Sequence, residues 1–444
     1  MARGQNILKK IDLPLLGMYY ILVIMGLLTI YSSSYSEEFP EIYAFNKPYG
    51  KQLFWIFVTS LIGGFILLLD SSFIKKTSYM TYGVVILMLI VVLLMPPIKG
   101  ARSWFKLGSF SLQPSEFAKF ATAMAVSYYM SQINVKMQDI KTKINVLLLL
   151  AIPGGLILMQ PDAGTLLVFF SFIFVMYREG LSGNILLGGF FMVIIGVLSV
   201  FIKASEASEN IFNFQIDGNY LFSGLIFLLG LLVMLIIKTL VLPRYRKERY
   251  KLTIATVIVS IVMILSVNWA FNNVFKDRHR SRFQIMFGIK EDRSGDGYNI
   301  YQALSAIGSG EFTGKGFLKG TLSNEKYKHV PEQSTDFIFC SWSEEWGFVG
   351  NTFLILIYIS FLIRIIMIAE RQRSKYNRIF GYSVASILFF HFMINIAMVI
   401  GLAPVIGIPL PFFSKGGSSI LSFSVMVFIL LRLDAGRTEE MTYS

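Results

Sequence analysis

Apolar residues in this chain fall into long runs rather than the short alternating patterns of a soluble protein. Leu, Ile, Val, Phe and Met dominate windows near residues 13–32, 52–69, 79–96, 117–131, 145–159, 163–177, 184–202, 219–241, 252–271, 350–369, 380–402 and 415–431. An α-helix needs about 20 apolar residues to cross the hydrocarbon core of a bilayer. The pattern therefore predicts an all-α polytopic integral membrane protein with about 10–12 transmembrane helices.

Lys and Arg residues in the short loops predict the orientation of these helices. Of the 40 basic residues, 22 lie in the N-terminal flank or after every second window, in segments such as 136–143, 238–251 and 364–378. Short basic loops stay on the cytoplasmic side of the membrane. We therefore expect a cytoplasmic N-terminus, a cytoplasmic C-terminus and a large extracytoplasmic loop at 273–347. The basic N-terminal flank lacks a small-residue cleavage site, so the first window is expected to remain as a span.

Composition narrows the function classes. Of the residues, 55% are hydrophobic and only 15% are charged, as expected for residues 1–444 forming a single polytopic membrane domain. The formal charge of +13 could indicate a nucleic-acid partner, but the basic residues flank apolar windows, which is typical of contact with anionic lipid headgroups. We expect no nucleic acid. The single cysteine, Cys340, excludes an intramolecular disulfide and a cysteine-based metal site.

The stretch QPSEFAKF, residues 113–120, places a carboxylate and an ammonium at the start of an apolar window. Pro114 suits the first turn of a helix, and Glu116 lies close to the positive end of the helix dipole. Glu116 and Lys119 are three residues apart, so they share a face and can pair. An interfacial ion pair with no further role is one interpretation. Because ionisable residues at membrane depth are costly, a functional cavity is the interpretation we favour.

Two neighbouring segments also interrupt the apolar pattern. Residues 102–112, RSWFKLGSFSL, are too short and polar to span, which predicts an interfacial or re-entrant segment. In MQPDAGT, Asp162 separates two apolar stretches and could mark a broken helix that lines a binding site. Asp162 could equally be the N-cap of the following helix at an ordinary turn.

The predicted long loop contains the densest polar grouping of the chain. Asp292 and Asp296 lie among four arginines at positions 278, 280, 282 and 293. Arginine grips phosphate bidentately, and a nearby carboxylate can act as a general base. A solvated charged loop is the simpler alternative. The glycine-rich run that follows matches neither a Walker A loop nor a dinucleotide fingerprint, so no nucleotide cofactor is expected. His279, His329 and His391 are scattered and are expected to be structural.

Together these motifs resemble one family, the shape, elongation, division and sporulation (SEDS) family of polytopic peptidoglycan glycosyltransferases, the RodA/FtsW group. The matching segments are 101–120, 160–165, 280–287, 292–299, 306–321, 330–339, 344–350 and 409–419, in the family's order. The GKG…KGT form at 314–321 is more similar to the RodA branch, which acts in cell elongation and shape maintenance. The resemblance covers most of the chain.

The resemblance implies a reaction and a location. Lipid II units would be joined into glycan strands on the outer face of the bacterial cytoplasmic (inner) membrane, by an inverting transfer that expels undecaprenyl pyrophosphate. The family's essential loop aspartate corresponds to Asp292, expected to be the general base or to organise the pyrophosphate and a divalent cation, Mg²⁺ or Mn²⁺. Implied partners are lipid II, a class B penicillin-binding protein transpeptidase and other membrane proteins of the elongation complex.

The resemblance also gives the candidate substrate-binding residues. Glu116, Lys119 and Asp162 match family positions that line a central cavity, and Gln113 opens the same motif. A pyrophosphate leaving group needs positive charge near it. In the predicted topology the basic residues on the outer side of the membrane include Arg102, Arg280 and Arg282.

The chain departs from the family in three places. Ser334 stands where the family usually has His, and Asn299 stands where Gln or His is common. The family typically has ten spans, so residues 203–272 are expected to be an extra two-helix insertion.

Two other functions remain open from the sequence. A lipid-linked precursor flippase or transporter would also use broken helices and charges at membrane depth. A non-catalytic scaffold of the wall-synthesis complex would need neither Glu116, Lys119 nor Asp292.

Overall fold

The computed structural model describes residues 10–97, 101–107, 110–206, 208–211, 214–273, 275, 277–290, 297–322 and 333–437. These residues form two compact units. The first combines residues up to Leu181 with those from Asn299 onward, and the second is Ser182–Tyr298. Each unit is described separately.

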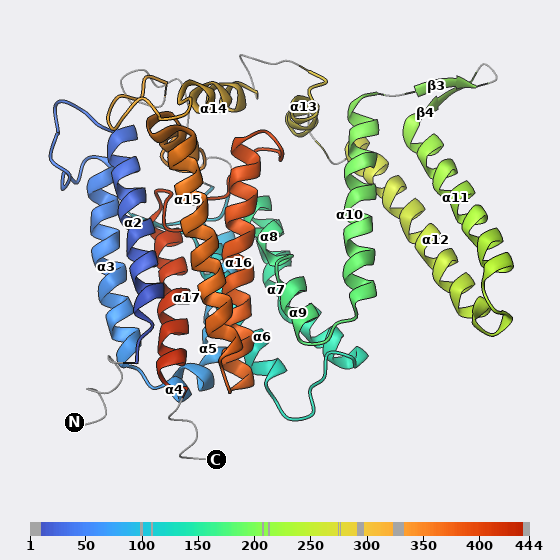
Figure 1. The fold of residues 1–444 in the computed structure, drawn as a ribbon, viewed down its shortest axis with the longest axis horizontal. Coiled ribbons are helices and arrows are strands. Elements are labelled where there is room, and N and C mark those ends of the chain that lie inside the picture. The colour runs from blue at the N-terminus through green and yellow to red at the C-terminus, as the bar shows by residue number, and fades with distance from the viewer. Residues whose placement is uncertain are drawn as a thin grey trace. The chain divides into compact units, whose positions relative to one another are not determined.

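The first unit is a helical bundle. Its helices are α2 (Leu13–Ser33), α3 (Pro48–Leu68), α4 (Ser71–Lys76), α5 (Ser78–Leu93), α6 (Pro114–Met130), α7 (Ile140–Met159), α8 (Ala163–Phe169), α9 (Phe172–Arg178), α14 (Tyr298–Ser309), α15 (Ile338–Glu370), α16 (Lys375–Val399) and α17 (Gly417–Ala435). Successive long helices run in opposite directions, and the start of α2 and the end of α17 lie at the same end of the bundle (Figure 1). We call this the inner end, since the loop charges predict that it is cytoplasmic, and the opposite end the outer end.

The helix boundaries follow from local sequence. Asp12 caps α2, with its side chain accepting from the Leu15 amide, and Pro14 occupies the first turn. Helix α15 is kinked at Gly347, whose φ of 60° is a left-handed conformation that favours glycine. The kink separates a first segment rich in polar residues from the apolar remainder of the helix.

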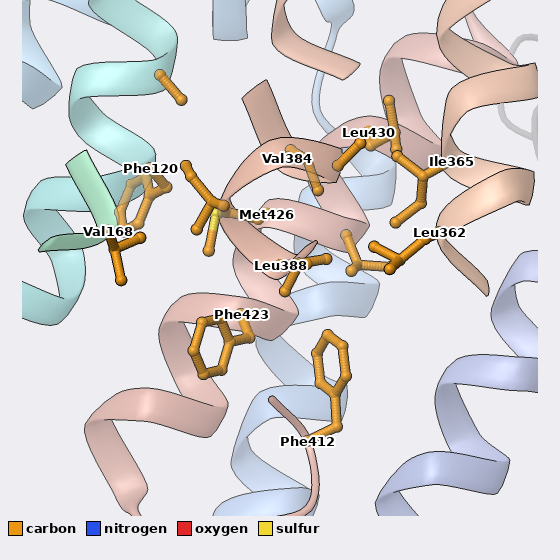
Figure 2. Close-up of a cluster of buried hydrophobic side chains, with 14 of the residues drawn as sticks. Phe120, Val168, Leu362, Ile365, Val384, Leu388, Phe412, Phe423, Met426 and Leu430 are labelled. Carbon is orange, nitrogen blue, oxygen red and sulfur yellow. The ribbon is translucent and has the colours of Figure 1, made fainter. Parts of the chain in front are cut away.

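Helix α17 lies at the centre of the bundle. Of its most apolar stretch, 83% is buried, and it packs against α3, α6 and α16. Figure 2 shows how Phe423, Met426 and Leu430 of α17 meet Leu388 of α16 and Leu362 of α15 in one apolar cluster. This core holds the outer ends of α6 and α16 beside each other.

The predicted pattern of spans is confirmed in the described residues. Nine described helices are long and apolar enough to cross a membrane. The windows near 79–96, 117–131 and 163–177 correspond to shorter helices: α5, α6 and the pair α8 and α9. The window at 163–177 is therefore divided into two helices, which meet at Phe170–Ser171.

The polar segment before α6 forms a β-hairpin. Strands β1 (Phe105–Leu107) and β2 (Phe110–Leu112) pair antiparallel, with Phe105 opposite Leu112. A two-stranded pair satisfies only the backbone groups that face the neighbouring strand, so its outer edges need other partners, as for any non-helical segment near a membrane. Its depth in the membrane stays a prediction.

The second unit contains α10 (Gly183–Ala204), the hairpin β3 (Ser208–Ile211) and β4 (Phe214–Asp217), α11 (Gly218–Leu240), α12 (Pro243–Asn273) and α13 (Asp277–Met286). Helix α12 packs against both α10 and α11. Gly230 of α11 allows the close approach, because a Cβ there would lie 2.4 Å from a methyl of Val257. The predicted insertion at 203–272 falls inside this unit, and its status as an insertion stays a prediction.

Candidate functional site at the start of helix α6

Helix α6 carries its charges in its first two turns, at the outer end of the bundle. Pro114 occupies the first turn, and Glu116 lies where its carboxylate meets the positive end of the helix dipole. The side chains of Glu116 and Lys119 are almost fully buried, and Lys119 Nζ lies 2.8 Å from Glu116 Oε2. The predicted ion pair is therefore present, and it lies in the protein interior rather than at an interface.

His391 of α16 is a third member of this cluster. Its Nε2 lies 2.9 Å from Lys119 Nζ, and its Nδ1 lies 3.2 Å from the Pro409 carbonyl oxygen. A carbonyl can only accept, so Nδ1 carries the proton and Nε2 accepts from the lysine ammonium. The geometry thus fixes one neutral tautomer of His391, which connects α6 to the segment before α17.

An aromatic ring covers the remaining side of the cluster. Lys119 Nζ lies 4.6 Å from the centre of the Phe423 ring, and the His391 ring meets the same phenyl edge-on at 4.8 Å. A cation over an aromatic face is stabilised when water is excluded. Ser422 donates to the Glu116 carbonyl at 2.6 Å, so α17 also holds the backbone of this turn.

Asp162 forms a second polar cluster beside the first. Its carboxylate accepts from the amide and the hydroxyl of Thr165, at 3.1 and 2.9 Å, which makes it the N-cap of α8. It also accepts from Gln113 Nε2 and Ser115 Oγ of the α6 start, both at 2.8 Å. Asp162 is therefore an N-cap, and it also joins α8 to α6.

Gln160 ties the same turn to its surroundings. The residue is fully buried, its carbonyl accepts from Ser103 at 3.0 Å, and its Nε2 donates to the Leu89 carbonyl at 3.2 Å. Its Oε1 has no hydrogen-bond partner among the described residues. A buried acceptor of this kind usually has a polar partner, such as an ordered water or a ligand group.

Two further family-like segments meet at this end of the bundle. Asn395 of α16 donates to the carbonyls of Asp336 and Ile408, at 2.9 and 2.7 Å. Ser414 donates to the Thr335 carbonyl at 2.7 Å, and the Lys415 amide donates to the Ser334 carbonyl at 2.9 Å. Segments 333–337 and 408–415 are thus bound to each other and to the helix that carries His391. Ser334 takes part through its backbone carbonyl.

The predicted site arginines are each described within their own unit. Arg102 is exposed, and its guanidinium donates to the Leu93 carbonyl at 3.4 Å. Arg280 and Arg282 belong to the second unit, where Arg280 donates to the carbonyls of Phe271 and Asn272, both at 2.8 Å. The predicted general base, Asp292, lies outside the described residues.

His391 was expected to be structural, and its contacts agree with that, but the sequence did not connect it with Lys119. It is 272 positions from Lys119, so nothing local connects the two. A signal was present, because His391 and Asn395 are four residues apart in an apolar window and therefore share one helix face. Polar residues on one face of a membrane helix point into the bundle.

The described residues contain no group of three or more His, Cys, Asp or Glu side chains that could hold a metal ion. The carboxylates of Glu116 and Asp162 are each engaged by protein donors. A divalent cation therefore stays a prediction that depends on Asp292.

The fold and the site define a polytopic α-helical membrane protein with a buried charge cluster near the outer ends of its helices. The chain belongs to the cell cycle protein family of FtsW, RodA and SpoVE, which matches residues 13–220 and 224–439.

Several characterised proteins are similar along the chain. The peptidoglycan glycosyltransferase RodA of Treponema pallidum is 30% identical over 440 residues, covering 96% of this chain and 97% of that protein. The peptidoglycan glycosyltransferase MrdB of Escherichia coli K12 is 31% identical over 324 residues, covering 73% of this chain and 68% of that protein. A solved structure from work on coordination of polymerization and crosslinking by a peptidoglycan synthase complex aligns with a TM-score of 0.67. It is 23% identical and covers 96% of this chain and 98% of that one, which shows a shared fold.

Proposed function

We propose that this chain is a peptidoglycan glycosyltransferase that polymerises lipid II into glycan strands on the outer face of the cytoplasmic membrane during cell elongation. Family membership over nearly the whole chain carries the proposal, because the relatives above bear this activity in their names. The outer-end clusters support it, since the starts of α6 and α8 and the segments 333–337 and 408–415 that α16 contacts all belong to stretches that resemble the family.

The proposed reaction is a nucleophilic substitution at a sugar carbon. The C4 hydroxyl of one disaccharide attacks the anomeric carbon of another and loses its proton to a general base. The bond from that carbon to the pyrophosphate oxygen breaks, and undecaprenyl pyrophosphate leaves with both bonding electrons. One displacement inverts the anomeric configuration. We assign the base to Asp292, and positive side chains or a divalent cation would stabilise the leaving group.

The observed contacts suggest different roles for the α6 residues. Glu116 and Lys119 are buried and pair with each other, so we propose that they position the start of α6. Gln113 and Asp162 are both half-buried, so they are the part of the network that can bind a lipid-linked sugar. The Asp162 carboxylate can accept a hydrogen bond from a sugar hydroxyl, and the Gln113 amide can donate or accept one. Arg102 is exposed and is available to an anionic group that approaches the outer end.

A transpeptidase is the proposed partner. The solved structure with the shared fold comes from a synthase complex that couples polymerization to crosslinking. A class B penicillin-binding protein would crosslink the strands that this chain produces. Other membrane proteins of the elongation complex are proposed on the family resemblance.

The test is glycan-strand formation from purified lipid II in liposomes, with and without the transpeptidase. Wild type, Asp292→Asn and Asp296→Asn are compared, since Asp296 is a matched carboxylate in the same segment. We expect polymer from wild type and Asp296→Asn but none from a folded Asp292→Asn. Equal activity in all three contradicts the assignment of the base.

Transport of labelled lipid II across the bilayer without polymer from wild type supports the flippase instead. Chelation with EDTA, followed by Mg²⁺ or Mn²⁺, tests the cation.

A further inference from the structure

A second polar cluster lies at the inner end of the bundle, where α2 begins and α15 and α17 end. Arg364 donates to Asp12 through Nε and an Nη, at 3.0 and 2.7 Å. Arg371 donates to Asp12 at 2.8 Å and pairs with Asp434, which also accepts from Arg437 at 3.1 Å. Two carboxylates thus hold three arginines.

This cluster surrounds a cavity of about 560 Å³, the inner-end pocket, lined by Lys10, Asp12, Arg364, Arg371, Asp434 and Arg437 among others. Four cations and two carboxylates leave a net charge of +2. The carboxylates are at most 2% exposed, whereas the three guanidinium side chains are between 27% and 39% exposed. The negative charges are therefore covered and the positive charges face the cavity, which favours an anionic ligand.

An apolar hollow of about 460 Å³ adjoins the inner-end pocket and shares Arg371 with it. Its other lining residues are Ile363, Ile366, Met367 and Glu370. Ile363 and Met367 are each 52% exposed on the surface of α15 that faces away from the bundle. The Glu370 carboxylate forms an ion pair with the Arg178 guanidinium at 2.9 Å, which neutralises its charge. A cationic pocket next to an apolar groove along a membrane helix matches the headgroup and acyl chain of a phospholipid.

We propose that the inner-end pocket and this groove bind one anionic phospholipid of the inner leaflet, with its phosphate at Arg371 and Arg437 and an acyl chain along Ile363 and Met367. The site lies between the start of α2, the last turns of α15 and the end of α17. It is at the opposite end of the bundle from the outer-end clusters. The proposal is independent of the enzymatic activity. Basic pockets between helices on the cytoplasmic side are suited to anionic headgroups.

The experiment is native mass spectrometry of the full-length protein in detergent, with added dioleoylphosphatidylglycerol or dioleoylphosphatidylcholine. We expect preferential retention of one phosphatidylglycerol. The double variant Lys10→Gln/Arg437→Gln is expected to lose about tenfold in retention, because two charges that attract the headgroup are removed. Lys141→Gln/Lys143→Gln removes two charges from the same end outside the pocket and is expected to match wild type.

Two further arms identify the ligand. Met367→Trp fills the groove and is expected to weaken lipid retention without weakening binding of glycerol phosphate, which has no acyl chain. Binding of glycerol phosphate or inorganic phosphate in preference to the lipid overturns the proposal in favour of a free anion. Lipid retention that appears only after removal of residues 438–444, which include Glu439 and Glu440, assigns the pocket to the chain's own acidic end. Equal retention of phosphatidylglycerol and phosphatidylcholine also overturns the phospholipid proposal. So does an equal loss of retention in Lys141→Gln/Lys143→Gln and in Lys10→Gln/Arg437→Gln. Thermal unfolding checks that each variant is folded.

Discussion

At the scale of single residues, Lys119 is the centre of the outer-end site. Its ammonium contacts a carboxylate, an imidazole and an aromatic ring, each from a different part of the sequence: Glu116, His391 and Phe423. Burying an ammonium is costly, and its hydrogen bonds and aromatic contact offset that cost, so loss of one contact weakens the whole cluster. The cluster therefore acts as one unit that fixes the start of α6.

We predict that Lys119→Met destabilises the protein and abolishes polymerisation. The substitution leaves Glu116 as an uncompensated buried charge, and breaking a buried pair costs about 3–5 kcal/mol. Lys119→Met/Glu116→Gln removes both charges and is expected to recover most of the lost thermal stability but not the activity. Unfolding in detergent and glycan-strand assays measure the two effects. Full activity in the double variant would show that the pair is only structural.

Asp162 and Asp139 provide a comparison between two helix caps. Both are N-cap residues, but only Asp162 accepts a hydrogen bond from the helix it precedes, and it also binds Gln113 and Ser115. We predict that Asp162→Ala lowers the free energy of unfolding by at least the ~1 kcal/mol of a lost cap. Asp139→Ala is expected to have little effect. Thermal unfolding of both variants measures the difference, and equal losses would contradict the role assigned to Asp162.

Sequence reasoning found part of this site. The spacing of Glu116 and Lys119 predicted their ion pair, because residues three apart on a helix are neighbours. It left two interpretations of Asp162 open, and the structure shows that the N-cap role is real. It did not find His391 or Phe423, because their contacts with Lys119 depend on how α16 and α17 pack against α6. The local sequence pattern does not predict how these helices pack.

At the scale of whole elements, close helix contacts depend on particular glycines. A Cβ on Gly63 of α3 would lie 2.4 Å from the Phe428 ring of α17, whereas a Cβ on Gly64 would have nothing within 4 Å. Gly63 therefore sets the distance between these two helices.

We predict that Gly63→Ala destabilises the protein by about 1–3 kcal/mol, since the Phe428 ring must move within a packed core. Gly64→Ala is the matched control and is expected to be neutral or slightly stabilising, because alanine has the higher helix propensity. Thermal unfolding in detergent compares the two. Equal effects would indicate that α3 and α17 are not packed as closely as described.

Asp12 links the first helix to the end of the bundle and makes stability depend on pH. Burial alone raises the pKa of Asp12, but the hydrogen bonds from Arg364, the Leu15 amide and Arg371 outweigh it and hold the pKa below its usual value of 3.8. A lowered pKa in the folded state contributes stability above the unfolded pKa of about 3.9, and that stability is lost as the pH falls through the folded value.

We therefore predict that the midpoint of thermal unfolding of wild type falls more between pH 6 and pH 3 than that of Asp12→Asn, which cannot be protonated. Asp70→Asn is the control, because the Asp70 side chain is 80% exposed. Its pH profile is expected to follow wild type. A parallel decline in wild type and Asp12→Asn would show that the pairs with Arg364 and Arg371 contribute no pH-dependent stability.

The sequence predicted the elements well, because membrane helices are determined by long apolar runs. The prediction was incomplete where packing against other segments, rather than an apolar run, determines the local structure. The segment before α6 forms a hairpin, and α15 begins at Ile338, well before its apolar window, because its first turns are buried among polar residues of the outer end. Burial of Glu344 illustrates this: its Oε1 accepts from the Thr321 and Leu322 amides, at 2.8 and 3.0 Å.

At the scale of the whole molecule, the two ends of the bundle have different polar chemistry. The outer end gathers motifs that resemble the family around α6, α8 and α16. The inner end gathers arginines around buried carboxylates and an apolar groove. This division agrees with a catalytic outer face and a lipid-contacting inner face, and it depends on the orientation that the loop charges predict.

Cysteine labelling tests that orientation directly. The native Cys340 is fully buried, so it contributes little background. We predict that Glu38→Cys, in the exposed α2–α3 loop at the outer end, reacts with a membrane-impermeant maleimide in intact cells. Lys141→Cys, an exposed position at the inner end, is expected to react only after the membrane is opened, because short basic loops remain in the cytoplasm. Cys340→Ser provides the unlabelled background. The reverse pattern would place the α6 clusters in the cytoplasm, where strand synthesis on the outer face is impossible, and would remove the basis of the proposed function.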